Sequence, residues 1–453
     1  MVIDVLETIV ISPSAPPVPS EIRPLPLSHL DNDVNLRIPF RTLRVFAGVD
    51  GSSVDPTTTF ASALSQSLPF FLPLASPLIP SPSTSLLHSH VSSPTNVLLH
   101  RAASSVPLLA LLRLLDSEPG SPFLDCLAPD PSPVEALARP LAFQVTRFAC
   151  GGFTLGMCVH HALCDGAGAT QFLAAVGRAA RGLGGPAVEP VWDREVLLGP
   201  RSPPRLGHPF HDFLAFDGKG LPYDDGRIGN IPPAREFFHV SNTRLEQLRT
   251  AMAAMAGSSF TGFEALGAYI WRARVIAKGL DCRERVTFVY SMSIKMVAKP
   301  ELPDGYWGNT CVPVYVCLLA GELLGNPLWE TAMLIKKSKQ GVTNEYVRSF
   351  IDFQEMNYTK GITAGKEVSG FTDWRRLSHH EVDFGWGGPV AVSPLTWRLL
   401  GSNEPSFFLP YAETGVEKKD CGFRVLVCLP EDVIAVFREE MAMFEQSTFR
   451  WRL

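Results

Sequence analysis

The chain has 453 residues, of which 46% are hydrophobic and 19% are charged, and its net charge at pH 7 is −5. This length predicts two packed domains of roughly 200 residues each, and the apolar content excludes a disordered chain. The small negative charge argues against a nucleic-acid-binding protein, and the absence of any run of about 18 apolar residues argues against a membrane-spanning one.

The N-terminal part predicts strands and a helix separated by irregular segments. Alternating residues in "VLETIVISPS" and "FRTLRVFAG" predict two strands on either side of a Pro-rich stretch. The apolar spacing of "TTTFASALSQSLPFF" predicts a helix, with Thr57 to Thr59 available as its cap. The Ser/Pro-rich residues 78–95 predict a loop.

The stretch "PLAFQVTRFACGGFTLGMCVHHALCDG", residues 140–166, is the most informative part of the sequence. It predicts a strand, a Gly-Gly turn and a second strand, after which "ATQFLAAVGRAA" predicts a helix. His160 and His161 therefore lie where a buried strand ends and a helix is about to begin. Catalytic groups are commonly found at such edges, because the scaffold is rigid and the tip is exposed.

Residues 186–235 are rich in Pro, Gly and Asp and show little periodicity, which predicts a long crossover linker. We therefore expect an N-terminal domain over residues 1–185 and a C-terminal domain over residues 236–453. In the second half, strands such as "REFFHVS" and "CGFRVLVCL" alternate with helices such as "NTRLEQLRTAMA" and "PEDVIAVFREEMAMF". Alternation in both halves predicts an α/β fold.

The cysteines and the start of the chain bear on the cellular compartment. Nine cysteines are scattered, and none forms a Cys-x-x-Cys pair, so we expect neither a disulfide framework nor a zinc site. The start "MVIDVLETIVISPSAPP" has no basic region followed by an apolar core, as a secretory signal would have. These features predict a cytoplasmic protein.

The segment "HHALCDGAG", from His160 to Gly168, is a candidate catalytic motif. A general base needs an imidazole held in one orientation, and an acid four residues after His161, Asp165, would organise the following turn. With 11 histidines in the chain, roughly half an occurrence of His-x-x-x-Asp is expected by chance. Taken alone, the motif is more typical of a packed histidine at a strand end and an acid that caps a helix than of a catalytic pair.

A second segment, "EVDFGWGGP", changes this balance. "HALCDG" and "DFGWG" in this order resemble the motifs of the plant BAHD acyltransferases, which transfer acyl groups from coenzyme A thioesters to alcohols or amines. The resemblance extends over the whole chain and includes "PLSHLDND", "FEALGAYIWRAR", "LPDGYWGN" and "FTDWRRL". It implies two similar domains of the chloramphenicol-acetyltransferase-like type, with mixed sheets flanked by helices and a long crossover loop between them.

The resemblance also implies roles for residues of the first motif. His161 would be the general base that takes the proton of the acceptor as it attacks the thioester carbonyl. Asp165 and Gly166 would hold the loop. Reaction would be direct within a ternary complex, with acyl-CoA as co-substrate, no bound cofactor and no metal, and we expect a monomer.

In the second motif, the resemblance implies a structural role. Asp383 would pair with an arginine, and Gly385 and Gly387 would belong to the same structural motif. Trp386 would either position substrate or simply pack. Ser258 and Ser259, in "SSF", would contact the pantetheine or phosphate arm of CoA.

Three features depart from the family pattern. Relatives carry an arginine before the Tyr-x-Gly-Asn turn, where this chain has "SIKMVAKPELP" and Lys295, so the partner of Asp383 stays open. "FFLPLASPL" lacks the Gly-Arg of the corresponding family segment. Residues 78–95 look short, which predicts a missing strand or hairpin.

Two other function classes remain alternatives. A condensation domain that forms amide bonds on carrier-bound acyl groups also shows His-His-x-x-x-Asp-Gly, but it lacks "DFGWG". A catalytically inactive binding relative is disfavoured because both His161 and Asp165 are present. Within the acyltransferases, the last third of the chain is most similar to members that use hydroxycinnamoyl- or benzoyl-CoA, and the sequence leaves an amine and a hydroxyl acceptor equally open.

Overall fold

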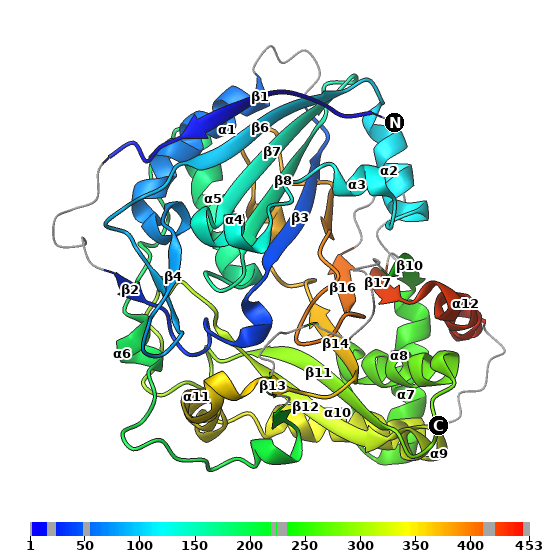
Figure 1. Cartoon of the computed structure of the whole chain (residues 1–453). Coiled ribbons are helices and arrows are strands. Elements are labelled where there is room, and N and C mark those ends of the chain that lie inside the picture. Colours follow the sequence, from blue (N-terminus) through cyan, green and yellow to red (C-terminus); the bar gives the residue numbers. More distant parts are fainter. Residues whose placement is uncertain are drawn as a thin grey trace. The chain divides into compact units, whose positions relative to one another are not determined.

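A computed structural model describes residues 2–15, 24–48, 55–216, 218, 223, 233–410 and 422–446 (Figure 1). Its contacts divide the chain into two compact units. Unit 1 comprises residues 1–202, 299–310 and 376–396, and unit 2 comprises residues 203–298, 311–375 and 397–453.

Unit 1 is built on a six-stranded sheet in the order β1-β6-β7-β8-β3-β15. The strands are β1 (Asp4–Ile11), β3 (Pro39–Phe46), β6 (Val97–Ser104), β7 (Leu141–Phe148), β8 (Phe153–His160) and β15 (Ala391–Pro394). β6 and β7 run parallel, and the other neighbouring pairs are antiparallel. Every residue of β8 is buried, which explains the nearly continuous apolar sequence of this strand.

Helices pack on both faces of this sheet. The helices of unit 1 are α1 (Pro56–Ser67), α2 (Leu108–Ser117), α3 (Pro122–Asp125), α4 (Pro133–Ala138), α5 (Gly166–Ala180) and α6 (Arg194–Leu198), with the 3-10 helices η2 (Val34–Leu36), η3 (Leu68–Phe70), η4 (Leu72–Ala75) and η7 (His379–Glu381). α1 and α5 pack on one face in a cluster that includes Phe143 and Phe172. α2 packs on the other face against Leu43 and Val45 of β3. The sheet is thus the middle layer of unit 1.

Unit 2 has a second six-stranded sheet, in the order β10-β17-β16-β14-β11-β12. Its strands are β10 (Ala234–Val240), β11 (Arg285–Ser293), β12 (Cys311–Leu319), β14 (Glu367–Asp373), β16 (Ser406–Pro410) and β17 (Phe423–Leu429). β14 pairs in parallel with both β11 and β16. The two units therefore each contain a mixed sheet flanked by helices, which confirms the expected fold class.

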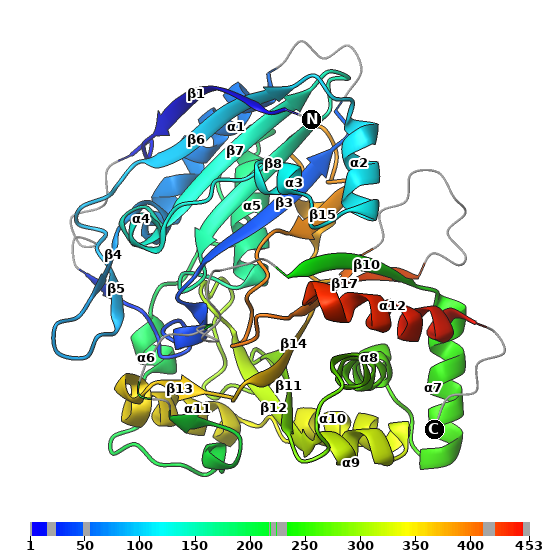
Figure 2. The same ribbon diagram turned by 45° about the vertical axis from the view of Figure 1, so that its right-hand side comes forward.

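The helices of unit 2 are α7 (Asn242–Ala256), α8 (Gly262–Lys278), α9 (Ala320–Gly325), α10 (Leu328–Gln340), α11 (Asn344–Asn357) and α12 (Glu431–Glu445), with η5 (Phe210–Asp212), η6 (Tyr358–Lys360) and a two-stranded sheet of β9 (Ala215–Phe216) and β13 (Ile362–Thr363). Helices α7, α9, α10 and α12 pack against α8 (Figure 2). α8 starts with a reciprocal cap between Thr261 and Glu264 and ends at Gly279, whose φ of 58° suits a glycine.

Two local expectations for the N-terminal part are wrong. Asp55, not Thr57 to Thr59, caps α1, because its carboxylate accepts a hydrogen bond from the N–H of Thr57 at 3.1 Å. Residues 78–95 were expected to form a loop and to lack a strand or hairpin. They instead contain β4 (Leu78–Pro80) and β5 (Leu87–Ser89), which pair with each other, and β5 also pairs with β2 (Leu25–Pro26). Strands of two or three residues leave almost no periodicity for a sequence to reveal.

The expected domain boundaries also differ from the division into units. The segments 299–310 and 376–396 belong to unit 1, so the "DFGWG" motif lies there and not in a C-terminal domain. The physical reason is that β15 adds to the edge of the first sheet by pairing with β3. The expected linker, residues 186–235, contains α6, η5 and β9 in its described part, and residues 217, 219–222 and 224–232 lie outside the described residues.

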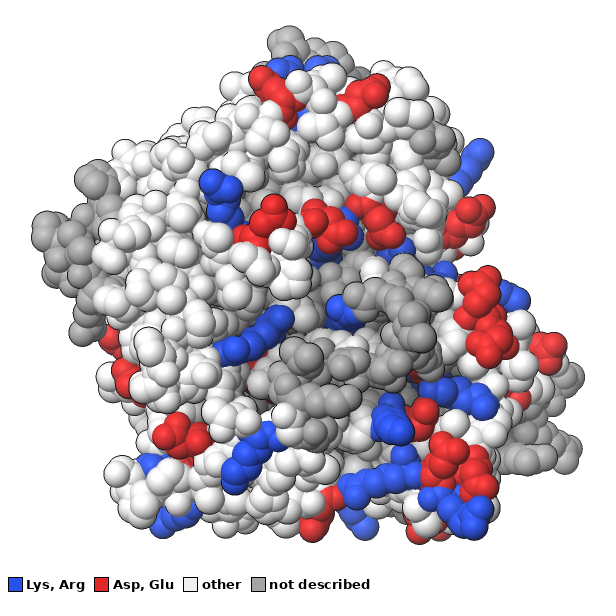
Figure 3. All heavy atoms as spheres, in the orientation of Figure 1, with Lys and Arg blue, Asp and Glu red and all other residues white. Residues whose placement is uncertain are grey.

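In the part of the chain that the structure describes, no helix is long and apolar enough to cross a membrane. On the face shown in Figure 3, Lys and Arg side chains are interspersed with Asp and Glu, and much of the described surface is uncharged.

Candidate active site

The two histidines at the end of β8 have different environments. His160 is only 2% exposed, and its Nδ1 accepts a hydrogen bond from the N–H of Ala162 at 3.4 Å. His161 is partly exposed, and its ring stands edge-on to Phe40 with 5.3 Å between ring centroids. The side chain available to a ligand is therefore that of His161.

The backbone of His161 is held from both sides. Its N–H donates to the carbonyl of Ile38 at 2.9 Å, and its carbonyl accepts from Nδ2 of Asn309 at 3.0 Å. Because the strand ladder of β8 ends at His160, these two contacts replace the pairing that the backbone of His161 would otherwise lack.

Burial lowers the pKa of His161 below its ordinary value, although its own carbonyl, the charge of Asp165, the amide of Asn309 and the charge of Asp31 all act in the opposite direction. Burial also lowers the pKa of His160, to about 3, with smaller effects from His161 and Arg37. Both rings are therefore neutral near pH 7, which is the state a general base requires.

Asp165 is the N-cap of α5 and is 8% exposed. Its Oδ1 accepts from the N–H of Gly168 at 2.9 Å, while its Oδ2 accepts from the N–H and Oγ1 of Thr310 at 2.8 and 2.9 Å. The carboxylate thus joins the start of α5 to the residue after "GYWGN". Gly166, the first residue of α5, is partly exposed, and a Cβ on it would lie 2.8 Å from the Cδ1 of Leu377.

A buried ion pair stands behind this loop and was not predicted from the sequence. Nη1 of Arg194 lies 3.2 Å from Oδ2 of Asp31, and the side chains are 2% and 0% exposed. Arg194 also donates to the carbonyls of Leu163 and Trp307 at 2.9 and 3.0 Å. Asp31 lies in "PLSHLDND", and the resemblance of this segment to the family was the one signal that could have pointed to it. Arg194 lies in the expected linker, where no sequence pattern indicates a buried arginine.

The "DFGWG" segment is a turn organised by Asp383. Oδ1 of Asp383 accepts from the N–H groups of Gly385 and Gly387 at 2.8 and 2.9 Å. The two glycines have φ values of 104° and 82°, which L-residues with side chains rarely adopt. Trp386 packs edge-on against Phe153, with 5.3 Å between the ring centroids. Of the two roles considered for Trp386, this contact fits packing.

The basic partner of Asp383 is Arg181, just after α5. Its Nη1 lies 3.5 Å from Oδ2 of Asp383, and the side chains are 35% and 27% exposed. Lys295, considered as a substitute partner from the sequence, belongs to unit 2 and is exposed.

Ser258 and Ser259 lie in unit 2 between α7 and α8, next to a lysine from α10. Nζ of Lys336 donates to Oγ of Ser258 at 2.8 Å and to the carbonyl of Ser259 at 2.7 Å, and it lies 5.7 Å from the ring centroid of Phe260. Ser258 and Lys336 are partly exposed. A hydroxyl next to an ammonium group at the surface suits a phosphate oxygen.

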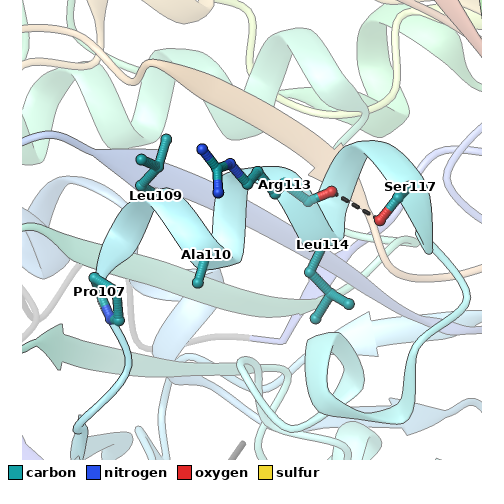
Figure 4. A pocket seen from close by; sticks show the side chains of 6 residues that line it. All are labelled: Pro107, Leu109, Ala110, Arg113, Leu114 and Ser117. Atoms are coloured by element: carbon teal, nitrogen blue, oxygen red, sulfur yellow. Dashed lines mark hydrogen bonds between the residues drawn. The ribbon is translucent and has the colours of Figure 1, made fainter.

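Other features of the described residues lie apart from these contacts. No three His, Cys, Asp or Glu side chains among them are grouped as a metal ion would need. A shallow hollow of about 360 Å³ on α2 is lined by Pro107, Leu109, Ala110, Arg113, Leu114 and Ser117 (Figure 4). None of the site residues above contributes to that hollow.

The model of the Transferase family matches residues 1–444. The chain is 31% identical to 3'-N-debenzoyl-2'-deoxytaxol N-benzoyltransferase of Taxus canadensis, over 95% of each chain. It is also 31% identical to spermidine sinapoyl-CoA acyltransferase of Arabidopsis thaliana, over 93% of each chain.

Solved structures with the same fold are more distant in sequence. Vinorine synthase superposes with a TM-score of 0.74 at 19% identity, covering 99% of both chains. The TRI101 protein of F. graminearum, solved with coenzyme A and deoxynivalenol, has a TM-score of 0.74 at 16% identity, covering 94% of this chain and 98% of that one. The first condensation domain of the CDA synthetase has a TM-score of 0.61 at 14% identity, covering 95% and 98%.

Proposed function

We propose, because the chain belongs to the BAHD acyltransferases of the Transferase family, that it transfers an acyl group from a coenzyme A thioester to an amine or a hydroxyl group of a plant specialised metabolite. The observation that carries this proposal is the neutral, partly exposed imidazole of His161, fixed through its backbone at the end of β8.

In the proposed reaction, His161 takes the proton of the acceptor N–H or O–H while the acceptor atom attacks the thioester carbonyl carbon. The tetrahedral intermediate then expels the thiolate of coenzyme A. The imidazolium returns the proton to that thiolate, which leaves an amide or ester and the free thiol. Asp165 takes no part in proton transfer, since hydrogen bonds from Gly168 and Thr310 occupy its oxygens.

Coenzyme A requires a place for its phosphates, and we assign this role to Ser258, Ser259 and Lys336. Lys336→Met is expected to raise the KM for the acyl-CoA by roughly 10- to 150-fold, since it removes a charge-assisted contact worth about 1.5–3 kcal/mol, and to leave kcat unchanged. Lys337→Met, on the exposed side of the same helix, is the matched control and should change neither constant. Equal KM values for both variants would remove Lys336 from the CoA site.

The donor proposed is an aromatic acyl-CoA, in line with the benzoyl and sinapoyl groups in the names of the two relatives. Acyl-CoA is a co-substrate, and no bound cofactor is invoked. The eight cysteines in the described residues are free thiols, which supports action in the cytoplasm. We infer a monomer that acts on small molecules, and size-exclusion chromatography at assay concentration tests this.

The test is a matrix of donors and acceptors with the purified protein. Benzoyl-CoA, sinapoyl-CoA, acetyl-CoA and a benzoyl group bound to a carrier protein are each combined with spermidine and with a long-chain alcohol, and the release of free thiol is measured together with product mass. We expect an aromatic donor to give acyl product with at least one acceptor. Product formation only from carrier-bound acyl groups would instead favour the condensation-type alternative, which shares the fold.

A further inference from the structure

Asp31 is at the centre of the hydrogen bonds that hold the backbone of His161 through Asn309. Oδ1 of Asp31 accepts from both the backbone N–H and the Nδ2 of Asn309, at 2.8 and 2.9 Å. Oδ2 accepts from the backbone N–H and the Oγ of Ser28, at 3.0 and 2.7 Å, and faces Arg194. A fully buried carboxylate is thus satisfied on both oxygens.

The arrangement determines which way the amide of Asn309 points. Its NH₂ group has two hydrogens, one directed at Asp31 and the other at the carbonyl of His161. If the amide were flipped, its oxygen would face both the carboxylate of Asp31 and the carbonyl of His161, so that three acceptors would meet without a donor. The negative charge of Asp31 therefore holds the amide in the orientation that hydrogen-bonds His161.

The carbonyl of His161 connects the amide of Asn309 to the residue that carries the imidazole. It is the backbone group that follows the end of β8, and it also acts on the imidazole of its own residue. A shift of this peptide group would move the Cα–Cβ bond of His161 and thus the ring. Misplacement of a reacting group by about 1 Å can reduce a rate by about 10²-fold.

Close packing keeps the cluster rigid. A Cβ on Gly308, next to Asn309, would lie 3.2 Å from Cζ of Arg194 and 3.3 Å from Oδ1 of Asp31. The guanidinium of Arg194 also lies 5.3 Å from the ring centroid of Trp307. Asp31, Arg194 and Asn309 all belong to unit 1.

We propose that Asp31 is a positioning residue for the base: through the side-chain amide of Asn309, its carboxylate fixes the peptide carbonyl of His161 and with it the direction of the imidazole. This inference rests on the proposed function, in which His161 is the base. Asp31 touches neither ring nor substrate in this role.

The charged and titratable groups near the imidazole of His161 determine how kcat/KM should depend on pH. They are Asp31 before η2, Asp165 at the start of α5 and the neighbouring His160. Both carboxylates raise the pKa of His161, so removal of the charge of Asp31 lowers it further. The acid limb of kcat/KM then moves to lower pH, because the base is neutral over a wider range.

The experiment compares Asn309→Ala, Asp31→Asn and the double variant with the wild type, using kcat, the pH profile of kcat/KM and the melting temperature. Asn309→Ala is expected to lower kcat by roughly 10- to 100-fold. Asp31→Asn is expected to lower kcat similarly and to shift the acid limb to lower pH, which a purely structural role would not do. In the double variant the kcat losses should not multiply, since Asp31 acts through Asn309.

Asp33→Asn is the matched control, because Asp33 is a buried acid in the same segment that hydrogen-bonds Asn35 and does not reach Asn309. Burial raises the pKa of Asp33 to about 6, so this variant also tests whether the acid limb belongs to Asp33. We expect it to keep the wild-type kcat and acid limb.

Wild-type kcat in Asn309→Ala overturns the proposal, and so do losses that multiply in the double variant. If Asp31→Asn does not fold, Asn309→Ala still decides, because it leaves the contacts of Asp31 with Ser28 and Arg194 in place. His161→Ala distinguishes a failure of the proposed function from a failure of the role of Asp31. An active His161→Ala contradicts the proposed function, whereas an inactive one beside a fully active Asn309→Ala contradicts only this inference.

Discussion

At the scale of single residues, the strand period explains why two adjacent histidines have different environments. Neighbouring residues at a strand end point to opposite sides, and the structure places His160 in the interior and leaves His161 partly exposed. His160 is a neutral ring buried in the interior, and His161 is the ring that we propose meets the substrate.

His160 has a consequence for stability that is separate from catalysis. Its pKa is about 3 in the folded protein and near its ordinary value of 6.5 in the unfolded chain. The unfolded state therefore binds more protons between these values, so the free energy of unfolding falls as pH drops below 6.5. This one group contributes about 2 kcal/mol of that fall between pH 6.5 and pH 5.

His160→Ala should therefore lose stability less steeply than the wild type between pH 7 and pH 5, while it keeps most of its turnover. Urea unfolding at several pH values, with kcat measured in parallel, checks this. His380→Ala, which removes an exposed histidine, is the control and should unfold as the wild type does. An unchanged pH dependence in His160→Ala, or a complete loss of turnover in a folded protein, would reverse the roles assigned to the two rings.

At the scale of elements, the "DFGWG" turn is a brace for the end of α5. Asp383 ties two backbone N–H groups and Arg181, whose Nε also donates to the carbonyl of Gly177 on α5 at 3.3 Å. The same segment approaches α5 closely, since a Cβ on Gly177 would lie 2.4 Å from the carbonyl oxygen of Asp383.

Asp383→Ala is expected to lower the free energy of unfolding by about 1.5–3 kcal/mol, mainly through the lost hydrogen bonds to a charged group. The ion pair with Arg181 adds little, because both side chains are substantially exposed. Thermal or urea unfolding measures the loss, and Asp383→Asn, which keeps one acceptor oxygen, should recover part of it. A variant with wild-type stability and no turnover would place Asp383 in the chemistry instead.

The sequence predicted the long helices and strands well, because their periodic patterns extend over many residues. It predicted poorly the features that depend on tertiary contacts between distant residues. The strands β7, β8 and β17 and the helices α5, α7 and α12 follow patterns of seven or more residues. By contrast, β4 and β5 have three residues each, and the cap of α1 depends on one carboxylate. His161 and Asp165 were found because their motif is local, whereas Arg194 and Asn309 join them only through tertiary contacts.

At the scale of the whole molecule, the first unit is assembled from three parts of the chain. Residues 1–202 supply His161, Asp31 and Arg194, residues 299–310 supply Asn309 and Thr310, and residues 376–396 supply the "DFGWG" turn and β15. A cut in the expected linker would therefore leave neither half with a complete first unit. The proposed base depends on residues nearly 150 positions later in the sequence, as the contact between Asn309 and His161 shows.

The proposal that His161 is the base is tested most directly by the turnover of His161→Ala with a donor–acceptor pair on which the wild type is active. We predict a fall in kcat of roughly 10²–10⁴-fold, with a similar KM for the acyl-CoA and a wild-type melting temperature. A folded His161→Ala protein that turns over at the wild-type rate would contradict it.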